Sequence, residues 1–160
     1  MAPDTPHARS APAKPWHSSA WPVVTHTTQV TVRWGDADPA GIAFYPRFYE
    51  WYDLATEALF ESIGLPFPDT FERYRIVGVP IVESGSTFLS PVRWADVLTI
   101  RSTIAWVKAK TFRVDHEVGV GDRPCARGFE VRAWVRKPET PGGPLRAEPI
   151  PPEVRERLGA

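Results

Sequence analysis

The 160-residue sequence has little cysteine, no excess of either charge and no long apolar run. Its single cysteine, Cys125, cannot form an intrachain disulfide, so the fold needs no oxidising compartment and a reducing cytoplasm is expected. The 19 basic and 19 acidic residues exclude binding of nucleic acid or an anionic membrane through overall charge. No segment approaches the roughly 20 apolar residues of a membrane span, and no secretory signal is expected. These absences indicate a soluble cytoplasmic domain.

Prolines are abundant but unevenly distributed. Of the 18, five lie near the start of the chain and six near its end. Because proline lacks a backbone donor and fixes φ, both ends are predicted to be extended rather than regular. Residues 1–24 are expected to form a flexible N-terminal extension, and residues 138–160 a proline-rich tail in which 152–158 form a short helix. The folded domain is expected to span residues 25–137.

Hydrophobic periodicity between these ends predicts one strand, one helix and then four strands. The strands alternate apolar and polar residues, whereas the helix begins at Pro46 and stops before Gly64 and Pro66. The predicted strands cover residues 27–34, 79–88, 97–107, 111–120 and 126–137, and the helix covers 46–63. Short gaps between the later strands favour antiparallel neighbours. The sequence therefore predicts an α+β fold in which a five-stranded antiparallel sheet wraps around the long helix.

The predicted helix has two surfaces that are not fully polar. Its apolar stripe, read at about 100° per residue, consists of Phe48, Trp51, Tyr52, Ala55, Leu59 and Ser62. A second surface, where a solvated back is normally found, carries Tyr49, Asp53, Thr56 and Phe60. We expect the stripe to pack on the sheet and the second surface to contact a partner subunit or a ligand.

The segment before the helix, residues 35–41, reads GDADPAG. Asp38 precedes Pro39 and is therefore biased to an extended backbone, while Gly41 permits a tight reversal. The helix that follows offers unpaired N–H groups and a positive dipole end, which suit a developing oxyanion. Aspartates in such loops otherwise cap nearby N–H groups, and this is the interpretation for Asp36. A metal site is not expected, because no histidine or further carboxylate accompanies the two aspartates.

Several motifs in fixed order resemble the 4-hydroxybenzoyl-CoA thioesterase family of hotdog-fold enzymes. They are GDADPAGI (35–42), FYP (44–46), WYD (51–53), IVGVPIV (76–82), DVLTI (96–100) and KTF (110–112). The resemblance implies that Asp38 is the catalytic carboxylate, acting as a nucleophile or as a general base. It also implies that the backbone N–H of Tyr45 polarises the thioester carbonyl. The substrate is then expected to lie beside Gly41, Ile42, Pro46, Tyr49 and Pro80.

Further binding residues follow from the resemblance and from local charge. At the position of Asp53 the family has an aspartate that receives the ring hydroxyl of the substrate, and a solvated helix aspartate is the equal alternative. Residues 93–137 hold ten basic side chains against five acidic ones. Lys108 and Lys110 flank a predicted turn where related enzymes bind the CoA phosphates. Most of the other cations, a set that includes Arg132, are expected to be solvated on exposed strand faces.

The sequence thus predicts an acyl-CoA thioesterase that acts on 4-hydroxybenzoyl-CoA or a related benzoyl-CoA, without a metal or redox cofactor. The alternatives are a general short-chain acyl-CoA thioesterase and a noncatalytic hotdog module that binds acyl-CoA or a protein. A hotdog hydratase is disfavoured, because Ala43 stands where its Asp-x-x-x-x-His arrangement needs histidine. His116 and Glu83 are not assigned to catalysis. The resemblance also implies a homo-oligomer, a dimer or a dimer of dimers, with sites between subunits.

Overall fold

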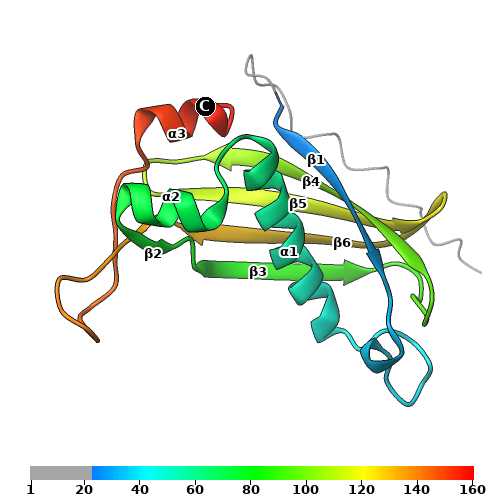
Figure 1. Cartoon of the computed structure of the whole chain (residues 1–160). Helices are drawn as coiled ribbons and strands as arrows, with labels where there is room; N and C mark the ends of the chain where they lie inside the picture. The colour runs from blue at the N-terminus through cyan, green and yellow to red at the C-terminus, as the bar shows by residue number, and fades with distance from the viewer. Residues whose placement is uncertain (1–22) are drawn as a thin grey trace, which may run out of the picture.

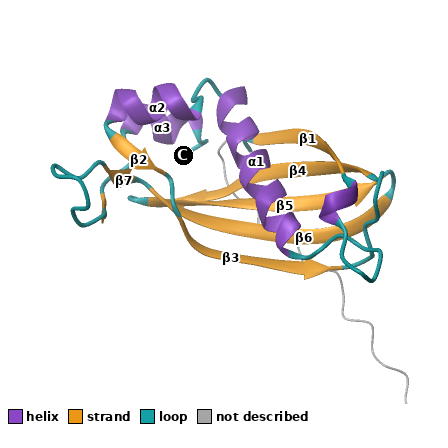
Figure 2. Ribbon diagram, turned by 60° about the horizontal axis from the view of Figure 1, so that its bottom comes forward, coloured by secondary structure: helices purple, strands orange, loops and turns teal. Residues whose placement is uncertain are grey.

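A computed structural model describes residues 23–160, and its main element is a five-stranded antiparallel sheet with one long helix across it (Figure 1). The sheet has the strand order β1-β4-β5-β6-β3. Its strands are β1 (Thr25–Thr31), β3 (Ile81–Phe88), β4 (Val97–Val107), β5 (Thr111–Val120) and β6 (Arg123–Ala133). Helix α1 (Pro46–Ser62) lies across one face of this sheet (Figure 2). The predicted α+β fold, with a sheet around one long helix, is confirmed.

Smaller elements complete the chain. They are the 3₁₀ helix η1 (Trp34–Asp36), α2 (Phe67–Tyr74), β2 (Ile76–Gly78), β7 (Val135–Arg136), β8 (Arg146–Ala147) and α3 (Pro152–Arg157). Strands β2, β7 and β8 form a second, three-stranded sheet. Helices α2 and α3 lie near the C-terminal end of α1, and η1 lies near its N-terminal end (Figure 2). No helix in the described part of the chain is long and apolar enough to cross a bilayer.

Prolines account for two differences between the predicted and observed elements. Helix α2 was not predicted, because Gly64 and Pro66 indicate the end of the preceding helix. In the structure Pro66 caps α2 and Pro68 lies in its first turn, where a missing N–H is tolerated. The predicted strand 79–88 begins only at Ile81, after Pro80, and a separate strand, β2, precedes it.

Helix α1 packs its two halves on two apolar clusters. The cluster under the first half joins the helix to three strands through Phe48, Trp51, Tyr52, Ala55, Leu98, Ile100, Val118 and Ala126. The cluster under the second half contains Leu59, Phe60, Phe112, Val114, Trp134, Ile150, Val154 and Leu158. Full burial of a large apolar side chain contributes roughly 1.5–3 kcal/mol. These clusters fix the position of α1 along its whole length.

The buried arc of α1 is wider than the predicted stripe. Thr56 and Phe60, assigned to the second surface, are fully buried, whereas Ser62, assigned to the stripe, is exposed. Glu130 on β6 contacts Thr56, and the rings of Phe67 on α2 and Phe112 on β5 pack against Phe60, so positions next to the stripe are buried as well. Of the predicted second surface, only Tyr49 and Asp53 retain accessible side chains.

The C-terminal segment packs against the sheet instead of standing apart as a tail. The N–H of Ile150 donates to the Ala109 carbonyl at 2.8 Å, and Arg155 Nη1 donates to the Lys108 carbonyl at 2.6 Å. Val154 on α3 is fully buried. The prolines here begin α3 and separate short elements, so they do not keep the chain away from the core. The predicted N-terminal extension lies outside the described residues, apart from Val23 and Val24.

Gly128 on β6 allows α1 to approach the sheet closely. The Tyr52 ring stacks on the His116 ring, with centroids 4.7 Å apart and planes 9° from parallel. The Tyr52 hydroxyl lies 2.8 Å from Ser86 Oγ, and burial raises the pKa of Tyr52 to about 12, so the phenol stays neutral. A methyl group on Gly128 would lie 2.3 Å from the Tyr52 ring. Glycine is therefore required at this position by space rather than by backbone conformation.

Replacing Gly128 by alanine is expected to lower the free energy of unfolding by about 1–3 kcal/mol, because the added methyl group forces the Tyr52 ring or β6 to shift. Urea unfolding followed by circular dichroism measures the change. Gly35→Ala is the matched control, since a methyl group there meets nothing within 4 Å. Equal stability of Gly128→Ala and the wild type would contradict this packing.

Candidate active site

The loop between η1 and α1 is a closed reversal that presents Asp38 to one side. The N–H of Asp38 donates to the Ile42 carbonyl at 2.9 Å, and the N–H of Gly41 donates to the Asp38 carbonyl at 2.9 Å. Gly41 has a φ of 75°, a conformation that glycine adopts without strain. The N–H of Ala43 donates to the Val92 carbonyl at 2.7 Å and thereby attaches the loop to the β3–β4 connection.

Asp36 shapes this loop, as predicted. Its side chain is buried and accepts the N–H of Arg33 at 2.8 Å, while its carbonyl accepts the N–H of Phe44 at 2.8 Å. Arg47 Nε lies 3.5 Å from the same carboxylate. With these partners Asp36 holds the two ends of the loop together and faces away from solvent.

Asp38 combines a turn contact with access to a hollow. One carboxylate oxygen accepts the N–H of Ala40 at 2.8 Å, and the other accepts no hydrogen bond from the described residues. The residue lines a hollow of about 480 Å³ between the start of α1 and the β3–β4 connection. We call it the Asp38 hollow. Its other lining residues are Ile42, Ala43, Tyr45, Phe48, Phe88, Leu89, Ser90, Pro91 and Val92. The walls are thus mainly apolar, with one carboxylate at the edge.

Tyr45 is the N-cap of α1 and has a free backbone donor. Pro46 at the first helical position has no N–H, and the N–H groups of Arg47 and Phe48 donate to Phe44 and Tyr45 carbonyls. Within residues 23–160, the N–H of Tyr45 has no acceptor. Because the positive end of the helix dipole lies here, this N–H can bind an oxygen that gains negative charge.

The structure distributes the other predicted binding residues around α1. Ile42 lines the Asp38 hollow, and the Gly41 carbonyl accepts a hydrogen bond from Arg93 Nη1 at 3.2 Å. Pro46 opens α1, and Tyr49 follows it one turn later, half-buried. Pro80 is exposed between β2 and β3. Of this set only Ile42 lies against the hollow itself.

Asp53 lies further along α1 and is not part of the Asp38 hollow. It follows Tyr45 by eight residues, which is about 12 Å of helical rise. Its side chain is exposed and forms an ion pair with Arg132. In a single copy of the chain, the two predicted functional carboxylates therefore face separate surroundings.

Lys108 and Lys110 lie at the opposite end of the sheet from Asp38. They belong to the turn after β4. At the other end of this strand, the backbone carbonyl of Asp96 accepts the N–H of Val32, close to the Asp38 loop. The 11 residues of β4 between these points span roughly 35 Å. Figure 1 shows the same separation, with α3 next to the β4–β5 turn and η1 at the other end. Lys108 Nζ also lies 4.6 Å from the Trp106 ring centroid.

Sequence reasoning missed the surroundings of Asp53. Arg132 was expected on a solvated strand face, but its side chain is only 4% exposed and contacts Glu130 beneath α1. Strand β6 turns the side chains of Glu130 and Arg132 toward the helix, and the buried His116 lies on the same face of β5. A signal was present: His116 alternates in phase with Phe112, Val114 and Val118, which are all buried. No cluster of three potential metal ligands exists among the described residues.

Comparison with known proteins identifies relatives over most of the chain. The model of the thioesterase-like superfamily matches residues 32–158. The 4-hydroxybenzoyl-CoA thioesterase of Pseudomonas sp. strain CBS-3 is 33% identical over 136 residues, which cover 81% of this chain and 94% of that enzyme. A solved structure of the enzyme from this strain is similar with a TM-score of 0.76, over 83% of this chain and 98% of that one.

Two further relatives extend the comparison. A 1,4-dihydroxy-2-naphthoyl-CoA hydrolase of Synechococcus sp. strain RCC307 is 27% identical over 133 residues, covering 81% of this chain and 97% of that enzyme. A solved gentisyl-coenzyme A thioesterase is 35% identical, with a TM-score of 0.71 over 81% of this chain and 99% of that one. The chain therefore belongs to the thioesterase-like superfamily of hotdog fold, and it is a thioester hydrolase.

Proposed function

We propose that the chain hydrolyses the CoA thioester of a hydroxylated aromatic acid, 4-hydroxybenzoyl-CoA or a close relative, to the free acid and CoA. The observation that carries the proposal is that Asp38 and Tyr45 line the same apolar hollow, and that the Tyr45 N–H has no acceptor among the described residues. These are a base or nucleophile and an oxyanion donor, the two groups that acyl transfer requires. The proposed location is the cytoplasm, where a buried free thiol such as that of Cys125 is expected.

In the proposed reaction the thioester oxygen accepts the Tyr45 N–H, which the α1 dipole strengthens as a donor. Asp38 either removes a proton from the attacking water or attacks the carbonyl carbon itself. The tetrahedral intermediate then breaks its C–S bond, and the CoA thiolate leaves and takes up a proton. In the nucleophilic case, water cleaves the resulting Asp38 anhydride. Groups of the chain and water serve every step, so we propose no metal or redox cofactor.

The names of the three relatives support the acyl group. They specify 4-hydroxybenzoyl, 1,4-dihydroxy-2-naphthoyl and gentisyl thioesters, all of which have a hydroxylated ring next to the carbonyl. The Asp38 hollow suits a ring, since Phe48 and Phe88 meet there edge to face with centroids 5.0 Å apart. Asp53 is the proposed acceptor of the ring hydroxyl.

A panel of aryl- and alkyl-CoA esters with detection of the free thiol tests this proposal. We expect kcat/KM for 4-hydroxybenzoyl-CoA to exceed that for acetyl- and butyryl-CoA by at least about 100-fold. Similar values for all esters would instead identify a general short-chain thioesterase. Binding of every ester without turnover would identify a noncatalytic module.

Asp38→Asn is expected to fold normally and to lose about 10²- to 10⁴-fold of kcat on aryl-CoA esters, because the amide is neither a base nor a nucleophile. Steady-state hydrolysis with circular dichroism as the folding check measures both. Asp96→Asn is the matched control, since Asp96 also accepts a backbone N–H at 2.8 Å in a turn. Unchanged hydrolysis by Asp38→Asn would refute the proposed role.

Asp53→Ala is expected to lower kcat/KM for 4-hydroxybenzoyl-CoA by roughly tenfold or more relative to benzoyl-CoA, because only the former loses a charged acceptor for its hydroxyl. The ratio of the two kcat/KM values is the measurement. An equal loss on both esters would show that Asp53 does not receive the hydroxyl.

We also propose that the working unit contains at least two copies of the chain, as a dimer or a dimer of dimers. Strand β3 is an edge of the sheet, and Ile81, Val82 and Phe88 on it are exposed. An exposed edge with apolar side chains is suited to pairing with a second copy. Asp53 and the Lys108–Lys110 turn both lie away from the Asp38 hollow of their own chain, which supports a site completed by the partner.

Mixing two variants, one impaired in CoA binding and one in catalysis, tests the shared site. Lys108→Ala/Lys110→Ala is expected to raise KM for acyl-CoA with a smaller effect on kcat, because it removes cations proposed to bind the CoA phosphates. In a mixed dimer with Asp38→Asn, one site receives Asp38 from one chain and both lysines from the other. Wild-type KM should therefore return at up to half of the sites after subunit exchange. No recovery in mixed dimers would place all three residues in sites within one chain.

A further inference from the structure

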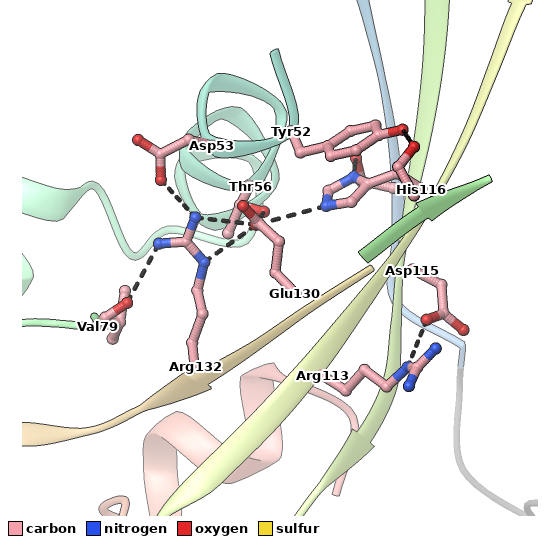
Figure 3. A network of polar contacts seen from close by, with 11 residues as sticks. Tyr52, Asp53, Thr56, Val79, Arg113, Asp115, His116, Glu130 and Arg132 are labelled. Carbon is pink, nitrogen blue, oxygen red and sulfur yellow. Dashed lines mark hydrogen bonds and ion pairs between the residues drawn. The ribbon is translucent and has the colours of Figure 1, made fainter. Parts of the chain in front are cut away.

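A chain of buried polar side chains runs beneath α1 from Asp53 to the centre of the sheet (Figure 3). Strands β4, β5 and β6 contribute Ser102, His116, Glu130 and Arg132, each at most 4% exposed. Buried charges and hydroxyls of this kind are costly unless each finds a partner. Their contacts therefore determine what the chain of side chains does.

Arg132 is held by a set of hydrogen bonds that only a guanidinium can make. Its Nε and Nη2 donate to Glu130 Oε2 at 3.1 and 2.9 Å, and its Nη1 donates to the Val79 carbonyl at 3.2 Å. Its Nη2 also donates to Asp53 Oδ1. The side chain thus joins β6, the residue before Pro80, and α1. A lysine ammonium at this position cannot reach all three partners from one point.

Glu130 is fixed in turn from the helix and from β5. Thr56 Oγ1 donates to Glu130 Oε2 at 2.7 Å, and His116 Nε2 lies 3.5 Å from the same oxygen. Ser102 Oγ lies 2.9 Å from His116 Nδ1, and when Ser102 donates to Nδ1, the ring proton lies on Nε2 and faces the carboxylate. Burial raises the pKa of Glu130, but His116, Arg132 and Thr56 together outweigh burial and lower it. Glu130 therefore stays ionised and balances the Arg132 charge.

Asp53 is the point where this network reaches the surface. Its side chain is 60% exposed, in contrast to the 4% of Arg132. Figure 3 shows one carboxylate oxygen facing Arg132 and the other turned away from the network. An exposed aspartate normally samples several rotamers and would have to be ordered by a ligand. The fixed guanidinium orders it in advance, so that its outward oxygen can accept a hydroxyl with less entropic cost.

We propose that Arg132 is a positioning residue that fixes Asp53 and the Val79–Pro80 segment relative to each other, and that it thereby selects acyl groups bearing a ring hydroxyl. This inference rests on the proposed function. Glu130, with Thr56 and His116 behind it, holds Arg132 in place and acts on the substrate only through Arg132 and Asp53. A purely structural role for the network predicts something different, namely a loss of stability with equal effects on all aryl-CoA esters.

A double-mutant cycle distinguishes the two roles. The selectivity is the kcat/KM ratio of 4-hydroxybenzoyl-CoA to benzoyl-CoA, measured for the wild type, Arg132→Met, Asp53→Ala and the double variant. We expect Arg132→Met to lower this ratio about tenfold, and to have no further effect once Asp53 is alanine. Either of two results would overturn the proposal. One is a ratio that Arg132→Met does not change, and the other is an equal decrease when Arg132→Met is introduced into the wild type and into Asp53→Ala.

Arg113→Met is the matched control. Arg113 also donates to an aspartate, Asp115, through Nε at 2.6 Å, but this pair projects from the other face of the sheet (Figure 3). We expect the selectivity to stay at the wild-type value in this variant. A decrease equal to that of Arg132→Met would show that any lost Arg–Asp pair on the sheet changes the ratio, and it would overturn the proposal.

Two milder variants keep the proposal testable when Arg132→Met does not fold. Arg132→Lys retains the positive charge but loses the guanidinium's several donors. We expect its selectivity to stay below the wild-type value. Thr56→Val removes one hydrogen bond to Glu130 and is expected to lower the selectivity about twofold to threefold, with benzoyl-CoA turnover retained. Wild-type selectivity in both folded variants would contradict the proposal.

Equilibrium binding separates failure of this inference from failure of the proposed function. The probes are two non-hydrolysable thioether analogues of aryl-CoA, one with and one without the para-hydroxyl, measured by calorimetry. Wild-type protein that turns over no aryl-CoA refutes the proposed function. A hydroxyl preference in binding that depends on Arg132 supports the inference even then, and equal binding of both analogues refutes it.

Discussion

The approach of helix α1 to the sheet is the constraint on which the rest of the structure depends. The Tyr52 ring occupies the space above Gly128 and stacks on His116, so the helix sits closer to β5 and β6 than any larger residue at 128 would allow. This contact sets where both ends of α1 lie. Its N-terminus meets the Asp38 loop, and its second half covers a cluster to which α3 contributes Val154. The backbone N–H of Tyr45 is therefore positioned by the packing of Tyr52, two turns further along α1.

The same close approach accounts for the charged groups under the helix. A sheet that contacts α1 along its length would normally present only apolar side chains, yet β5 and β6 place His116, Glu130 and Arg132 there. The two charges are tolerated because Glu130 and Arg132 pair with each other, and Thr56 and Asp53 on α1 add further partners. A buried network of this kind specifies the rotation of the helix about its axis more narrowly than apolar packing does. It also connects the core to Asp53, whose carboxylate faces solvent.

Local chemistry explains why part of the structure could be predicted. Strand alternation and the proline at the start of α1 depend on residues close in sequence, so β3, β4, β5 and α1 were located to within a few residues. The loop-shaping role of Asp36 was also predicted from local residues, since its carboxylate accepts the N–H of Arg33, whereas the catalytic role of Asp38 stays a prediction. Helix α2 and the docked C-terminal segment were not predicted. Their prolines indicate breaks locally, and only contacts with distant residues such as Ala109 show that the chain folds back.

The sequence by itself determined the order of the main elements through their periodicity, and it determined the loop–helix junction around Asp38 and Tyr45 through local residues. The hotdog fold and the candidate chemistry were implied by short motifs that resemble a known family. The tertiary structure decided which charges are buried, that Arg132 joins Asp53 to Glu130, and that Lys108 lies at the far end of β4 from Asp38. These features depend on strand register and on how far the sheet curves around the helix. Both are set by pairing between residues distant in sequence, which no local pattern encodes.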